Sequence, residues 1–219
     1  MRHSFISLII SCLFFTSLNS NAQTSFIEGE IVYAVRIESV NPKLEKQIST
    51  GELIIKLKGN SVTKELSLIS GFKNTMLFEK GKDAYSLIKI GGEQFALQLD
   101  AEQLKKKQLK CASFTTEEYT NDIKSIAGFK TEKAKLLCND APPLLIYYTK
   151  EWTINNEYLF ENFPFFQYLP LTYDIKNDDG SLFHFELLTI EASPQDNGAF
   201  KIPDGYKKIS YEEYKSWQH

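Results

Sequence analysis

Apolar and polar residues alternate along much of this chain, and the alternation starts early in the sequence. Between Gly29 and Ile37, apolar side chains repeat at every second position, and charged residues occur only at the positions between them. A period of two is typical of a β-strand with one buried face, because successive side chains point to opposite faces. Residues 29–37 are therefore predicted to form a half-buried strand.

Turn-forming residues separate the apolar segments that follow. Lys-Gly-Asn-Ser at 58–61, Lys-Gly-Lys-Asp at 80–83 and Gly-Gly-Glu at 91–93 each lie between two such segments. Glycine and asparagine accept the backbone angles of tight turns, so these positions predict consecutive β-hairpins. Consecutive hairpins form an antiparallel meander, and a long meander must curl or be covered to bury one face.

The second half of the chain is predicted to continue the sheet. A short helix or loop is expected at 101–110, and strands are expected at 123–137, 142–152 and 181–192. The segment 156–174 differs, because it is rich in aromatic residues and its Pro164 and Pro170 prevent one long helix. It is predicted to form a short helix up to about Asn162 and then an irregular, largely buried crossing.

The chain is predicted to close on a strand and a tight turn. Phe200 and Ile202 would lie on one face of that strand, and Pro203 would end it because proline has no N–H for the ladder. Pro-Asp-Gly at 203–205 suits a tight turn, after which Tyr206 can fold back onto the sheet.

A short terminal helix is predicted after this turn. Ser210 and Glu213 have the spacing of a capping box, and the helix would run through Trp217. The predicted fold is mainly β (α+β): residues 23–219 form one domain, a strongly curved antiparallel meander, or half-barrel. The sheet would wrap a short helix or an irregular aromatic plug, and the closing segment would dock on it.

The first residues predict export. Arg2 precedes an apolar run from Phe5 to Leu18, and small polar residues follow, as in a secretory signal peptide (residues 1–22) cut after Ala22. The run is too short for a transmembrane segment, which needs about 20 residues. A lipid on Cys12 is the alternative, although the apolar run continues beyond that cysteine. A periplasmic or secreted protein is expected.

Charge and cysteine content narrow the partners. The formal charge is −3, and the loss of Arg2 with the signal peptide would make it −4, so a nucleic-acid partner is not expected. Lys105–Lys107 are predicted to be solvated, with contact to anionic lipid heads as the alternative. Cys111 and Cys138 predict a disulfide in an oxidising compartment, with two free thiols as the alternative. Metal binding is not expected, since the mature chain has only two histidines.

Five short motifs occur in an order that resembles a known family. They are "FIEGEIVY" near the mature start, "IAGFKTEKA" at 126–134, "YYT" at 147–149, "PLTYD" at 170–174 and "FKIPDGYKK" at 200–208. The set resembles the uncharacterised secreted proteins of Gram-negative envelopes grouped as the GLPGLI family. The resemblance implies a fold similar to periplasmic lipoprotein carriers of the LolA type, in which a curved antiparallel sheet wraps a helical plug.

The chain also departs from that family. Its naming motif is absent, and Leu169-Pro170-Leu171 is the nearest sequence. Thr131 stands where some relatives carry a cysteine, so the resemblance does not establish the disulfide. It also carries over no catalytic residue.

The search for catalytic motifs is negative. Gly-x-Ser-x-Gly, a phosphate-binding glycine loop and His-Glu-x-x-His are all absent. Ser61 and Lys64 match Ser-x-x-Lys, but they are assigned to a hairpin turn instead of a helix start. His184 lies between phenylalanines and is predicted to pack in the sheet. The expectation is a non-catalytic protein without a cofactor.

A curled sheet leaves a concave apolar face, and such faces commonly hold small ligands. The residues expected on this face and on an aromatic lid over it are Tyr33, Val35, Ile55, Leu57, Met76, Phe78, Phe163, Phe165 and Phe166. Two functions follow. The protein either binds a lipid or another apolar small molecule there, or has a filled core and serves as an interaction module for another envelope protein.

Overall fold

The computed structural model describes residues 24–39, 47–107, 114–119, 125–138, 141–160, 166–176 and 180–217. The signal peptide at 1–22, Cys12, Cys111, Phe163 and Phe165 lie outside these ranges. Export, the lipid anchor and the Cys111–Cys138 disulfide therefore stay predictions.

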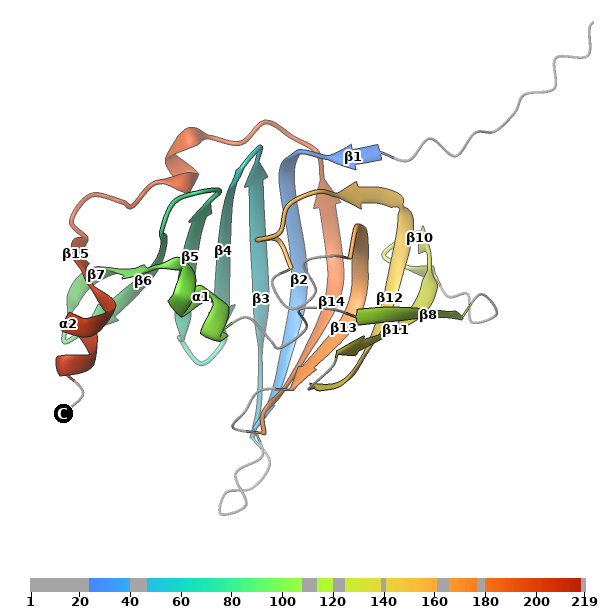
Figure 1. The fold of residues 1–219 in the computed structure, drawn as a ribbon, viewed down its shortest axis with the longest axis horizontal. Coiled ribbons are helices and arrows are strands. Elements are labelled where there is room, and N and C mark those ends of the chain that lie inside the picture. The colour runs from blue at the N-terminus through green and yellow to red at the C-terminus, as the bar shows by residue number, and fades with distance from the viewer. Residues whose placement is uncertain are drawn as a thin grey trace, which may run out of the picture.

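β-Strands make up most of the described chain (Figure 1). The first half contains β1 (Thr24–Phe26), β2 (Glu28–Ser39), β3 (Gln47–Lys58), β4 (Ser61–Leu68), β5 (Lys73–Glu79), β6 (Ala84–Ile90), β7 (Glu93–Leu99) and α1 (Ala101–Lys107). The predicted turns at 58–61, 80–83 and 91–93 are confirmed as the connections β3–β4, β5–β6 and β6–β7.

The second half continues the sheet and ends in short elements. It contains β8 (Phe114–Tyr119), β9 (Ser125–Ile126), β10 (Phe129–Lys130), β11 (Glu132–Cys138), β12 (Ala141–Ile154), β13 (Tyr168–Lys176), β14 (Leu182–Glu191), the 3₁₀ helix η1 (Asn197–Phe200), β15 (Lys207–Ile209) and α2 (Tyr211–Ser216). The predicted terminal helix is confirmed, and Ser210 caps it by accepting a hydrogen bond from the Glu213 amide at 3.1 Å.

One large sheet holds nearly all these strands, in the order β15-β7-β6-β5-β4-β3-β2-β14-β13-β12-β11-β8, with β1 also paired to β12. Its neighbours are antiparallel, except that β15 pairs with β7 and β1 pairs with β12 in parallel. The sheet curves so that one face is concave (Figure 1). The predicted mainly β fold is confirmed, and the parallel pairs make the sheet mixed.

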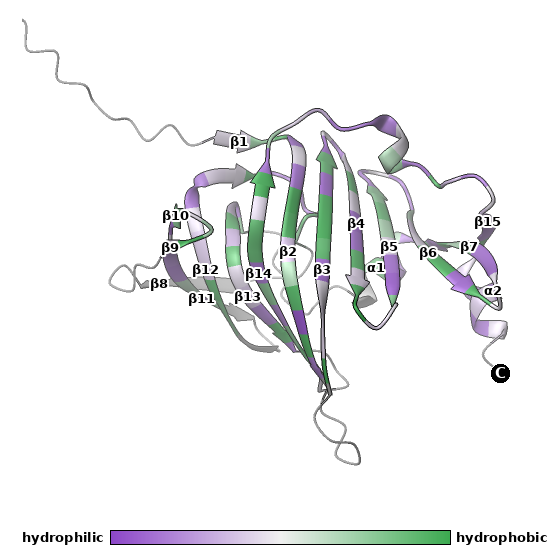
Figure 2. Ribbon diagram, turned by 180° about the vertical axis from the view of Figure 1, so that it is seen from behind, coloured by the Kyte–Doolittle hydropathy of each residue, from purple (hydrophilic) through white to green (hydrophobic). Residues whose placement is uncertain are grey.

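The alternation of the sequence determines which face is buried. Figure 2 shows apolar and polar residues following one another along β2, β3 and β14. Ile31 lies opposite Ile55, and Tyr33 lies opposite Leu53. Ile31, Tyr33 and Ile55 are at most 1% exposed. Full burial of such a side chain stabilises the fold by about 1.5–3 kcal/mol, so the concave face forms the main core.

The helix predicted before Asn162 is wrong over the described part of that segment, where residues 155–160 form a turn. Asn156 explains the difference. Its side-chain oxygen accepts a hydrogen bond from the Tyr158 amide at 3.0 Å, and its amide nitrogen donates to the Gly59 carbonyl at 3.2 Å. An asparagine that bonds the backbone two residues ahead favours a turn over a helix.

The strand predicted around Phe200 and Ile202 is also wrong. Residues 197–200 form η1, and the parallel strand β15 follows the Pro-Asp-Gly turn instead of preceding it. The carbonyl of Ala199 accepts a hydrogen bond from the Thr63 hydroxyl at 2.7 Å, so this segment is held by a side chain of β4. Ile202 and Tyr206 nevertheless pack on the sheet, as expected of a docking segment.

None of the helices in the described ranges has the length and apolar character needed to cross a bilayer.

Candidate ligand-binding site

A pocket of about 170 Å³ lies on the concave side of the sheet. We call it the inner pocket. Its walls come from β3, β4 and β5 on one side, from β13 and β14 on the other, and from the turn after β12. The lining residues are Leu53, Lys64, Leu66, Asn74, Met76, Leu159, Phe160, Tyr173, Ile175, Phe183 and Phe185. An apolar cavity of about 150 Å³ is large enough to hold benzene.

The position of the pocket follows from the strand order. Leu66 is near the end of β4 and Asn74 near the start of β5, while Ile175 is near the end of β13 and Phe183 near the start of β14. The pocket therefore lies toward the end of the sheet that carries the β4–β5 and β13–β14 connections.

Most residues that the sequence assigned to a ligand site belong to the filled core. Tyr33, Val35, Ile55, Leu57 and Phe78 are at most 6% exposed and pack together. Their inward orientation agrees with the predicted alternation, but none of the five lines the inner pocket.

Two further predicted residues have different positions. Met76 lines the inner pocket. Phe166 is buried and packs its ring edge-on against Tyr148, with centroids 5.1 Å apart. Whether any of these residues contacts a ligand stays a prediction.

Aromatic rings form the back wall of the inner pocket. The rings of Tyr173 and Phe185 are stacked with centroids 4.6 Å apart, and Phe160 lies edge-on to Tyr173 at 6.1 Å. Burial raises the pKa of Tyr173 far above its ordinary value, so its hydroxyl stays neutral. This wall offers apolar contact together with one neutral hydroxyl group.

Lys64 is the unexpected polar residue of the inner pocket. It lies between Ile55 of β3 and Met76 of β5 in the register, and it is only 8% exposed. Its Nζ atom is 5.3 Å from the centroid of the Phe78 ring. Burial disfavours the charged amine and lowers the pKa of Lys64 from 10.5 to about 7.

The sequence contained a signal for this lysine. Lys64 was placed in a turn because of its Ser-x-x-Lys match, whereas β4 already begins at Ser61. Val62, Lys64 and Leu66 continue the alternation of the strand, which assigns Lys64 to the inner face. A lysine at a core-facing position is the pattern that identifies it.

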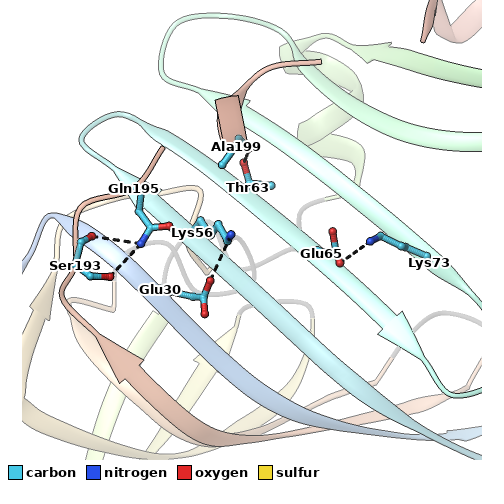
Figure 3. Close-up of polar contacts among 8 residues, drawn as sticks. All are labelled: Glu30, Lys56, Thr63, Glu65, Lys73, Ser193, Gln195 and Ala199. Carbon is cyan, nitrogen blue, oxygen red and sulfur yellow. Dashed lines mark hydrogen bonds and ion pairs between the residues drawn. The ribbon is translucent and has the colours of Figure 1, made fainter. Parts of the chain in front are cut away.

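The outer face of the sheet is polar and partly covered by the chain end. Figure 3 shows Glu30 paired with Lys56, and Glu65 paired with Lys73. The same view shows Thr63 donating to the carbonyl of Ala199. We call residues 192–206 the C-terminal segment.

Two grooves border the C-terminal segment, with volumes of about 340 and 780 Å³. Both are larger than the inner pocket. Charged side chains contribute to their walls, including Lys56 and Glu65 in the smaller groove and Asp83 and Lys208 in the larger. The inner pocket has the more apolar walls and is the better candidate for an apolar ligand.

Residues suited to metal binding or acid–base chemistry are not gathered in the described parts of the chain. Within those ranges, no three His, Cys, Asp or Glu side chains lie close enough to hold a metal ion. His184 is half-buried on the outer face and contacts the Asp174 carboxylate. His184 and Asp174 pair across β13 and β14, away from the inner pocket.

Comparison with known proteins gives similarity in structure alone. No protein-family model matches the sequence, and no curated protein matches it significantly. An uncharacterised conserved protein from Thermus thermophilus is similar over 87% of this chain and 92% of its own, with 7% identity and a TM-score of 0.50. This likeness concerns the fold.

Two weaker likenesses involve proteins with names. MucB, whose complex with MucA is known from Pseudomonas aeruginosa, matches 82% of this chain and 59% of its own at 13% identity and a TM-score of 0.43. A LolA superfamily protein from Nitrosomonas europaea matches 82% and 92% at 10% identity and a TM-score of 0.38. The matched structures thus include a LolA superfamily protein, as the sequence resemblance implied. TM-scores below 0.5 support no statement about ligand or partner.

Proposed function

We propose that this protein is an exported, non-catalytic protein that binds a small apolar ligand in the inner pocket. The observation that carries the proposal is the pocket itself, which lies between two walls of one curved sheet where the rest of the concave face is filled. Its lining is largely aliphatic and aromatic, as in most small-molecule sites. Lys64, Asn74 and Tyr173 supply its few polar groups.

Calorimetric titration with 1-octanol tests this proposal. The wild-type protein should bind the alcohol with one site per chain. Leu66→Trp fills the inner pocket and should abolish binding, whereas Leu188→Trp makes the same change at a position that is 46% exposed and should leave binding intact. Thermal melts of both variants establish that they fold. A wild-type protein that binds no octanol, or equal binding by both variants, would contradict the proposal.

A second function is supported by a different observation. Ile69 and Phe72, in the turn between β4 and β5, are 84% and 53% exposed. Apolar side chains that remain this exposed are typical of protein contact sites. The protein would then be an interaction module for another envelope protein.

A photoreactive amino acid at position 72 tests this second function in the producing cells. It should trap one stoichiometric partner, whereas the same residue at position 215 on α2 should not. Equal or absent cross-linking at both positions would count against the interaction module.

A further inference from the structure

We propose that the ligand of the inner pocket is a medium-chain aliphatic carboxylic acid, and that its carboxylate pairs with the Lys64 ammonium group. This inference rests on the proposed function, because it names the ligand class of the same pocket. It is carried by the position of one cationic side chain on otherwise largely apolar walls.

The polar groups of the inner pocket favour an acid over other apolar ligands. Lys64 is the cationic residue among the described residues that line it, and no carboxylate lines it. Tyr173 is the other titratable residue of that lining, and burial keeps it neutral. Asn74 uses its amide nitrogen as a donor to the Ser86 hydroxyl at 3.1 Å. A bound carboxylate would bring the negative charge that these walls do not supply.

Burial makes such a pairing selective. An ammonium group in apolar surroundings has lost most of its hydration, and the nearby Phe78 ring replaces only a small part of it. A ligand carboxylate can accept charge-assisted hydrogen bonds from the ammonium donors. A neutral alcohol of the same length cannot supply this charge, so the acid should bind at least about tenfold more tightly.

The size of the inner pocket restricts the acid. About 170 Å³ accommodates the carboxylate and the first carbons of a chain, but not a long acyl chain. Additional methylene groups would extend toward the end of the sheet where Leu66 and Asn74 lie. Ile69 and Phe72 are exposed there and would contact them. Octanoate is therefore a suitable probe.

Calorimetry at pH 6.5 with octanoate and 1-octanol tests the inference. Wild-type protein should prefer octanoate by at least about tenfold. Lys64→Met keeps a long apolar stem but removes the charge, so it should abolish the preference while octanol still binds. Lys73→Met is the matched control: it removes a lysine of the neighbouring strand whose side chain is 60% exposed on the outer face, and it should keep the preference.

Titration of the wild-type protein gives a second measurement that does not depend on the folding of Lys64→Met. Lys64 loses its proton in the free protein near pH 7, so octanoate affinity should fall by up to about tenfold per pH unit above that value. Octanol affinity should not change over the same range, because neither the alcohol nor Tyr173 ionises there.

The outcomes separate the inference from the proposed function. Octanol binding without a preference for octanoate would overturn the carboxylate assignment and leave the pocket as a site for neutral ligands. Binding of neither probe would overturn both. A preference lost in Lys73→Met as well as in Lys64→Met would show that overall charge attracts the acid, which would overturn the role of Lys64.

Discussion

The hydroxyl of Tyr33 donates a hydrogen bond to the backbone carbonyl of Pro170 at 2.7 Å across the concave side of the sheet. Tyr33 belongs to β2 and Pro170 to β13, and β14 separates these strands in the sheet order. The bond therefore connects strands that share no backbone ladder. Both residues are buried, so the bond satisfies two polar groups that water does not reach.

Tyr33→Phe should lower the free energy of unfolding by about 1–3 kcal/mol, because it leaves the buried carbonyl of Pro170 without this donor. Urea denaturation followed by tryptophan fluorescence measures the change. Tyr85→Phe is the matched control, since its ring is half-buried on the outer face. A loss of equal size in both variants would mean that the bond across the sheet contributes nothing specific.

The hairpins could be predicted because their signals are local. Alternation gives the strand, and Gly or Asn between two apolar segments gives the turn, as at Gly59. The buried Asn156 contact and the Thr63–Ala199 bond could not be predicted in this way. Each joins residues that are distant in sequence, and each decides the local conformation of its segment.

The site was predicted less well than the fold for a related reason. Inward-facing residues such as Val35 and Leu57 can be recognised from alternation, but alternation does not tell where a core is filled and where it is hollow. Lys64 was missed because a motif match took precedence over the register of its strand.

Thr63→Val should loosen the C-terminal segment, because it removes the hydroxyl that bonds to the carbonyl of Ala199. The expected loss is about 1 kcal/mol, confined to this part of the molecule. Faster hydrogen exchange of peptides from residues 192–206, with little change in β2, would show it. Thr75→Val serves as control, since Thr75 lines the same outer groove on β5. Equal exchange in both variants would contradict the prediction.

Ser210→Ala should destabilise α2, because the serine hydroxyl accepts a hydrogen bond from the Glu213 amide at the first turn. Loss of an N-cap costs about 0.5–2 kcal/mol. The readout is hydrogen exchange of residues 211–217, with Ser70→Ala in the exposed β4–β5 turn as control. Exchange that stays at the wild-type rate in Ser210→Ala would show that packing of the helix against β7, not its cap, keeps it folded.

The buried amine of Lys64 should make stability depend on pH in a defined direction. Its pKa is lowered to about 7 in the folded protein, while the unfolded chain has the ordinary value of 10.5. Between these values the unfolded chain binds more protons than the folded one, so stability rises with pH through this window. Below pH 7 the lysine is protonated in both states, and the contribution is lost.

Comparison with Lys64→Met isolates this effect from other titrations. Relative to the variant, the free energy of unfolding of the wild type should rise from pH 7 to pH 10, with a slope of up to about 1.4 kcal/mol per pH unit. Guanidinium denaturation at several pH values measures the difference. The same comparison with Lys73→Met should be flat, because that ammonium is largely in water before and after unfolding. A flat difference for Lys64→Met would mean that water or a charged group reaches the amine, and it would remove the electrostatic reason for a carboxylate ligand.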